Sequence, residues 1–159
     1  MVATFSWSEQ NSSGNTGSIA NLNFGSTGAP NIVALDYPVN TGTNSYEKWI
    51  TGSFGGTFTK INNVQFWKSA GAYVTGETIF WSGSVTTFVT PVATASTYAV
   101  GSVPAADPAT ANVSIHSSLT GSLLAVGSTD YIVLQQQITS AASPGATNQK
   151  TFTIQYDEV

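Results

Sequence analysis

The chemistry open to this chain is limited first by its nucleophiles and by its only imidazole. Serine is plentiful, but His116 is the single histidine, so any Ser-His-Asp triad would have to recruit it. The Gly-x-Ser-x-Gly turn that presents a nucleophilic serine in many hydrolases does not occur. His116 ends a segment, 112–116, whose alternation is typical of a strand, where a histidine is more often structural than catalytic. We therefore predict no nucleophilic catalysis.

Carboxylates offer a second kind of chemistry, because a glycoside hydrolase needs only two of them. Four lie near the ends of predicted strands, where loops could bring two together: Asp36, Glu47, Glu77 and Asp130. Glu47 directly precedes Lys48, which favours a solvated ion pair, and Asp107 and Asp130 also suit turns. Either of these two aspartates could join a calcium site in a loop, but EF-hand spacing is absent. We therefore predict a protein that is not an enzyme and holds no metal or other cofactor.

Aromatic side chains support a stronger hypothesis, a stacking platform for sugar rings like that of carbohydrate-binding sandwiches. Six residues are candidates for it: Trp7, Tyr46, Trp49, Trp67, Tyr73 and Trp81. The alternative for Trp67 and Trp81, each of which follows a phenylalanine, is that they fill the core between two sheets. Trp7 and Trp49 are less clearly core residues, and we expect them at an exposed aromatic rim.

Charge and cysteine content exclude several classes of function. Charged residues make up only 8% of the 159 residues, and the net charge is −4. The four basic residues are scattered lysines, which cannot form the basic surface that nucleic acid requires, so we predict no nucleic-acid partner. The absence of cysteine excludes disulfides, thiolate catalysis and cysteine-based zinc sites. No window resembles a membrane span or a signal peptide, so we also predict no membrane contact.

The elements that must position these side chains are β-strands, because the hydrophobic period is close to two along most of the chain. Segments 131–139 and 150–156 alternate clearly. Pro144-Gly145 lies in the loop between them, so we predict that they pair as an antiparallel hairpin. Further candidate strands are 78–90, with Ile79, Trp81 and Val85 on one face, and 4–8, 31–35, 97–103, 112–116 and 122–126.

Two pairs of small residues predict turns in the first half of the chain. Gly55-Gly56 separates segments 46–54 and 57–61, and such a pair is typical of a two-residue hairpin turn. Asn62-Asn63 then predicts a second turn or a bulge. No stretch has a convincing helical stripe. Nine or ten short strands with turns between them predict an all-β, single-domain antiparallel β-sandwich, with a jelly-roll-like arrangement.

The segment from Glu9 to Pro30 differs in composition, since Asn, Ser, Gly and Thr dominate it. It is either a long loop or an arm that becomes ordered only against a partner. Because Phe5 and Trp7 precede it, we favour an N-terminal strand followed by a mobile connector. The predicted organisation is therefore a strand and flexible polar arm over residues 1–30 and a β-sandwich over residues 31–159.

Several phrases in the second half of the chain resemble a group of small β-rich proteins from tailed bacteriophages. They are Asn63-Val-Gln-Phe-Trp-Lys-Ser-Ala-Gly71, Asp107-Pro-Ala-Thr-Ala-Asn112, Ser128-Thr-Asp-Tyr-Ile-Val-Leu-Gln135, Ala142-Ser-Pro-Gly-Ala146 and Phe152-Thr-Ile-Gln-Tyr-Asp-Glu158. The resemblance covers residues 55–159. It implies a virion structural protein, most plausibly a capsid decoration (cement) protein on the outer surface of the head, with the major capsid protein as partner.

Decoration proteins of this kind are often trimers at three-fold axes, so the resemblance also implies a homo-oligomer, with a trimer as the first guess. We expect the N-terminal arm and the aromatic rim to make the contacts. The residues predicted to bind a partner are Trp7, Asn11, Asn15, Asn21, Phe24 and Trp49. The alternative function is a carbohydrate-binding module of a tail or fibre protein that uses exposed aromatics.

Overall fold

The computed structural model describes residues 2–11, 14–92 and 94–159. Over these residues the protein is all-β, contains no helix, and pairs its strands antiparallel, which confirms the predicted fold class. The strands are β1 (Ala3–Asn11), β2 (Gly14–Gly17), β3 (Lys48–Gly56), β4 (Ile61–Ala70), β5 (Glu77–Val85), β6 (Gly101–Ser102), β7 (Gly127–Ser128), β8 (Tyr131–Ile138) and β9 (Thr151–Glu158). The described part of the chain has no helix long and apolar enough to cross a membrane.

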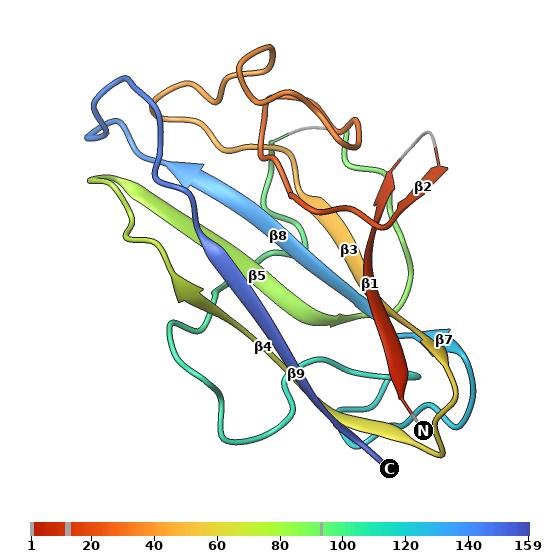
Figure 1. The fold of residues 1–159 in the computed structure, drawn as a ribbon. Helices are drawn as coiled ribbons and strands as arrows, with labels where there is room; N and C mark the ends of the chain where they lie inside the picture. The colour runs from red at the N-terminus through yellow and green to blue at the C-terminus, as the bar shows by residue number, and fades with distance from the viewer. Residues whose placement is uncertain (1, 12–13, 93) are drawn as a thin grey trace.

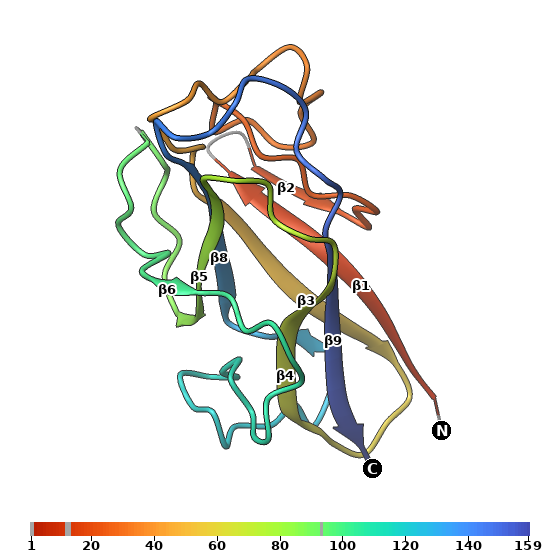
Figure 2. The same cartoon turned by 90° about the vertical axis from the view of Figure 1, so that its left-hand side faces the viewer.

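The strands form two layers of unequal size. The larger sheet has the order β2-β1-β3-β8-β5-β6, with β7 also paired to β3, and β4 and β9 form a separate two-stranded sheet. The β4–β9 pair lies across one face of the larger sheet as a second layer (Figures 1 and 2). The result is a sandwich of one broad and one narrow sheet, and the jelly-roll arrangement stays a prediction.

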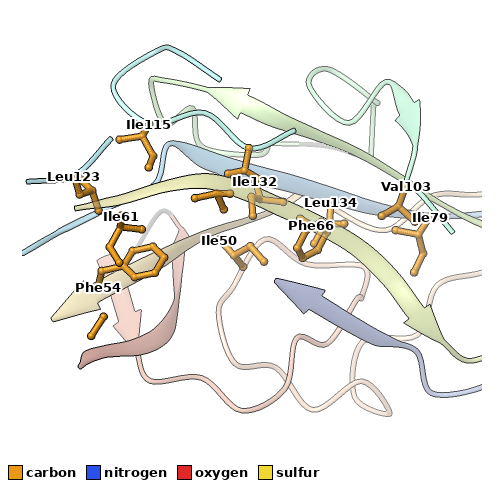
Figure 3. Packing of buried hydrophobic residues seen from close by; sticks show 13 residues of the cluster. Ile50, Phe54, Ile61, Phe66, Ile79, Val103, Ile115, Leu123, Ile132 and Leu134 are labelled. Carbon is orange, nitrogen blue, oxygen red and sulfur yellow. The ribbon is translucent and has the colours of Figure 1, made fainter. Parts of the chain in front are cut away.

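The main core lies between the inner face of the larger sheet and the β4–β9 pair (Figure 3). Ile50 of β3, Ile79 of β5 and Leu134 of β8 supply the larger sheet's side, and Phe66 of β4 covers them; each is at most 5% exposed. Removing such side chains from water stabilises the fold by roughly 1.5–3 kcal/mol each. A smaller cluster on the outer face surrounds Trp49.

Two predicted hairpins are wrong, and the predicted strand over 57–61 does not form, because residues 57–60 are an irregular connection between β3 and β4. β8 pairs with β3 and β5, whereas β9 pairs with β4 in the other sheet. Gly55 and Gly56 are not a hairpin turn: both belong to β3 and pair with Thr4 and Ala3 of β1. Alternation shows which face of a strand is buried, but it does not show which strand lies beside it. The chain changes layer from β3 to β4, from β4 to β5 and from β8 to β9, so these consecutive strands do not pair with each other.

Bulges alter which face some residues occupy. The bulge predicted at Asn62-Asn63 is confirmed, because the β4–β9 register shifts between Asn62 and Gln65, and Asn63 has a φ of 52°. A second register shift lies between Ser82 and Val85 of β5. It corrects the prediction that Val85 shares a face with Ile79, since Val85 instead packs in the Trp49 cluster.

The N-terminal segment packs into the sandwich. β1 pairs with β3 from Ala3 to Gln10, and beyond β2 the side chains of Ile19, Leu22 and Phe24 pack against the main core. The predicted division at residue 30 therefore falls inside one packed unit. That residues 9–30 move in solution stays a prediction.

Candidate functional site

A cleft opens between the two sheets at the end where β8 ends and β9 begins. Its volume is ≈ 510 Å³, which lies in the range of small-molecule binding sites. Ile50, Ile79 and Leu134 form its floor, and the chain segments 19–24 and 147–152 line its sides. Figure 1 shows long loops gathered at this end of the sandwich, away from the two termini. We call it the loop end.

The cleft forms because the inner face of the larger sheet changes from apolar to polar there. Along β8, Ile132 and Leu134 belong to the main core, and the next residue on that face is Gln136. On β5 the same change separates Ile79 from Glu77. Ile79 pairs with Gln136 in the β5–β8 register, so the two polar side chains occupy the same end of the face.

Glu77 is the centre of a buried polar cluster in the wall of the cleft. Lys150 Nζ donates to both carboxylate oxygens at 2.5 Å, and the side chains of this ion pair are only 5% and 0% exposed. Gln136 Nε2 donates to Oε1 at 2.7 Å, and the Val74 amide donates to Oε2 at 3.0 Å. The cluster fixes the loop before β9 against β5 and β8, so the wall is held in place without a ligand.

Aromatic rings also contribute to the lining of the cleft. Phe66 is a core residue, 0% exposed, that stacks on Phe152, with centroids 5.5 Å apart and an interplanar angle of 8°, and on Trp81, while Trp7 meets it edge-on at 6.0 Å. Trp7 and Phe24, both half-buried, line the cleft. The lining of the cleft therefore combines aromatic and hydrogen-bonding side chains.

The structure separates the six residues predicted to bind a partner. Trp7, Asn21 and Phe24 line the cleft. Asn15 is exposed on β2, and Asn11 is buried at the end of β1. The cleft thus unites half of the predicted set.

The prediction that Trp49 lies at an exposed rim is wrong, because its side chain is 0% exposed. It points to the outer face of the larger sheet, where the rings of Phe88, Tyr98 and Tyr131 pack around it at centroid distances of 5.2, 4.8 and 5.5 Å. The segment that contains Phe88 and Tyr98 covers this face. The predicted strands 78–90 and 97–103 would contain Phe88 and Tyr98, but β5 ends at Val85 and β6 spans only Gly101–Ser102, so both rings lie outside the strands.

The other candidate aromatics do not share one surface. Trp81 stacks on Phe66 at 5.5 Å, so it belongs to the core, as the alternative interpretation held. Trp67 is half-buried and belongs to neither apolar cluster. Tyr46 donates to the Val92 carbonyl at 3.4 Å. The ring of Tyr73 lies under the Lys68 and Lys150 ammonium groups, and burial raises the pKa of this tyrosine.

The sequence-predicted carboxylates also do not meet. Glu77 lines the cleft, whereas Glu47 accepts backbone hydrogen bonds from Thr97, Tyr98 and Ala99 on the other side of the sheet. Among the described residues that line the cleft, Glu77 is the one carboxylate. The geometry of a two-carboxylate glycosidase is therefore not formed by these residues.

Asp130 and His116 lie at the opposite end of the sandwich. Asp130 Oδ2 accepts hydrogen bonds from Ser114 Oγ at 2.5 Å and from the Ser117 amide at 2.8 Å. His116 is exposed and has a φ of 52°, in a tight turn. Ser114 therefore donates directly to a carboxylate and fixes this turn. Within the described ranges, no group of three or more His, Asp or Glu side chains could hold a metal ion.

Sequence reasoning missed a buried ion pair between Glu9 and Lys48. Lys48 Nζ lies 3.1 Å from Glu9 Oε1, and both side chains are 1% exposed. Lys48 also donates to the Ala29 carbonyl at 2.6 Å, and the Asn31 amide donates to Glu9 Oε2 at 3.1 Å. The prediction of a solvated Glu47–Lys48 pair is wrong, because adjacent strand residues point to opposite faces.

A second candidate surface lies on the loops beside the cleft. Two loops there carry exposed apolar side chains, which we group under the name loop-end patch: Val33 (58% exposed), Leu35 (90%), Tyr37 (42%), Val89 (46%) and Val92 (85%). The two loops that carry them are joined through Tyr46, whose amide donates to Gly25 and whose hydroxyl donates to Val92. A second set, Leu119, Leu124 and Val126, is exposed on the segment where Leu123 bridges to Ile61, which in turn pairs with Glu158 near the C-terminus.

The comparisons with known proteins add no relative: no protein-family model, no curated protein and no solved structure matches this chain.

Proposed function

We propose that this protein is a non-enzymatic structural protein of a tailed-phage virion, which binds the outer surface of the assembled head and stabilises it. The observation that carries the proposal is the loop-end patch. Leu35 and Val92 are 90% and 85% exposed, although both are large aliphatic side chains on loops that are tied to the sandwich. Large aliphatic side chains exposed to this extent on fixed loops support a protein contact at this end of the domain.

The charge distribution supports the same proposal. Only 8% of the residues are charged, and three of the four lysines bind within the chain: Lys48 to Glu9, Lys150 to Glu77 and Lys68 to the Gly71 carbonyl. Few charges remain to repel neighbouring copies, so the protein tolerates crowding on a shell. A trimer that contacts the major capsid protein through the loop-end patch is the arrangement we propose.

The patch gives a test of the proposal on isolated components. We expect the double variant Leu35→Ser/Val92→Ser to bind heads that lack this protein at least about tenfold more weakly than the wild type does, because buried apolar anchors dominate interface energies. Both side chains are exposed, so the variant is expected to fold normally. Binding is measured by co-sedimentation with purified heads.

The matched control is Leu124→Ser/Val126→Ser, which removes a leucine and a valine that are 72% and 71% exposed at the opposite end. We expect it to bind heads like the wild type. Unchanged binding of the Leu35/Val92 variant, or a loss confined to the control, would contradict the proposed orientation on the head.

A further inference from the structure

The walls of the cleft suit a ligand with one apolar face and a polar edge. Trp7 and Phe24, both half-buried, present aromatic rings to the cleft, and Gln136, Asn21 and Asn148 present amide groups to it. Flat rings bind the C–H face of a sugar, while amides exchange hydrogen bonds with its hydroxyls. An open cleft with a few fixed polar groups is the usual form of a small-ligand site.

The charges in the cleft cancel within the wall. Of the described residues that line it, Glu77 and Lys150 carry charge, and each binds the other. The lining residues therefore carry no net charge that would attract an anionic or a cationic ligand. Moving a charged ligand from water into the cleft would cost desolvation free energy, which no unpaired charge in the lining offsets. The occupant is therefore neutral.

Hydrogen-bonding capacity remains unused around the cleft. Gln136 is only 7% exposed, and its Nε2 donates to Glu77 and Thr147, but its Oε1 accepts no hydrogen bond from the described residues. Asn23 and Asn148 each use Nδ2 on a carbonyl, and no described partner binds the Oδ1 of either. The side chain of Asn21 is exposed and makes no hydrogen bond to the described residues.

From these walls we infer that the cleft binds a neutral sugar, with one pyranose ring packed against Trp7 and Phe24 and its hydroxyls bonded to Gln136 and Asn21. This inference goes beyond attachment to the head. A particle decorated with this protein would then be able to bind a glycan. The cleft lies beside the loop-end patch and shares no residue with it, so both could be occupied at once. It also replaces the predicted platform of exposed aromatics, whose members are dispersed.

The test titrates the isolated full chain with glucose, galactose, mannose and N-acetylglucosamine, and follows tryptophan emission and heat. Trp7 is the reporter, and a Trp67→Phe background removes one of the two half-buried tryptophans outside the cleft, the other being Trp81 in the core. We expect a saturable change with at least one of these sugars. Glucuronate, which differs from glucose by a carboxylate, is expected to bind no more tightly than glucose.

A pair of asparagine variants locates the site. Asn21→Ala removes an exposed amide that lines the cleft, and Asn15→Ala removes an exposed amide from β2, outside it. We expect Asn21→Ala to weaken binding about fivefold, the effect of one hydrogen bond, and Asn15→Ala to leave it unchanged. Neither side chain is needed for packing, so both variants are expected to fold.

Three outcomes would overturn the inference. They are flat titrations for all the neutral sugars into the tens of millimolar, a preference for glucuronate, or equal losses in the two asparagine variants. All are measured on the free protein, whereas the head-binding assay uses Leu35 and Val92. A negative sugar titration therefore does not contradict the proposed head attachment. A negative head-binding assay likewise does not contradict the proposed sugar site.

Discussion

Replacing Glu9 by glutamine is expected to lower the free energy of unfolding by about 3–5 kcal/mol. The substitution leaves the Lys48 ammonium buried with the Ala29 carbonyl as its remaining partner, because both side chains of the pair are 1% exposed. An unpaired charge in such surroundings costs more than the pair contributes. Urea unfolding monitored by tryptophan fluorescence measures the loss.

The double variant Glu9→Gln/Lys48→Met separates the pair's net contribution from the cost of breaking it. It removes both charges and keeps the side-chain volumes similar, so we expect it to recover most of the stability lost in Glu9→Gln. Glu158→Gln is the matched control, since Glu158 is exposed, and we expect it to change stability by less than about 0.5 kcal/mol. A double variant as unstable as Glu9→Gln would contradict the account of this pair.

The pH dependence of Glu9→Gln follows from Lys48. Burial lowers the pKa of Lys48 below 10.5, and Glu9 partly opposes that shift. Without Glu9 the folded-state pKa falls further, while the unfolded value stays the same. Where the unfolded chain binds more protons than the folded one, stability rises with pH. The deficit of the variant should therefore shrink as the pH rises through the window between the two folded-state pKa values, both below 10.5.

Replacing Glu47 by alanine is the second large effect, and we expect it to cost about 3 kcal/mol. Glu47 Oε1 accepts hydrogen bonds from three consecutive amides, those of Thr97, Tyr98 and Ala99, at 2.8, 2.7 and 2.9 Å. Bonds to an ionised acceptor are stronger than neutral ones. The Ala99 amide is buried, so losing its acceptor leaves an unsatisfied donor in the interior.

The Glu47→Ala substitution should also alter the surroundings of Trp49. The segment fixed by Glu47 carries Tyr98, which packs 4.8 Å from the Trp49 ring. Loosening it admits water to Trp49, so we expect the emission of Glu47→Ala to shift to longer wavelength before global unfolding. Asp107→Ala, which removes an exposed carboxylate, is the control. A Glu47→Ala variant with wild-type stability and emission would show that the three amides do not depend on this carboxylate.

The strands could be predicted from the sequence because alternation records burial directly. β8 and β9 fall close to the predicted segments, and the Asn62-Asn63 bulge is where two small polar residues interrupt an apolar run. Their partners could not be predicted, since β3, β5 and β9 all present apolar faces that would suit β8. Choosing among them depends on how the two layers cover each other, which no local pattern records.

The candidate site could be predicted only in part, for a related reason. Trp7, Asn21 and Phe24 were identified as binding residues, and all three line the cleft. Gln136, Glu77 and Lys150 come from distant parts of the chain, and only the β5–β8 register and the path of the loop before β9 bring them together. The burial of Trp49 could not be predicted either, because it depends on the segment that carries Phe88 and Tyr98, which packs on the outer face of the sheet without forming a strand there.

The central proposal is attachment to a phage head. Its most direct test is the copy number of this protein in virus particles purified from its source. Quantitative mass spectrometry gives the ratio to the major capsid protein. The account predicts a ratio near one, or a fixed simple fraction of it, because a decoration protein occupies equivalent positions on the shell lattice. A handful of copies per particle, or none, would contradict it.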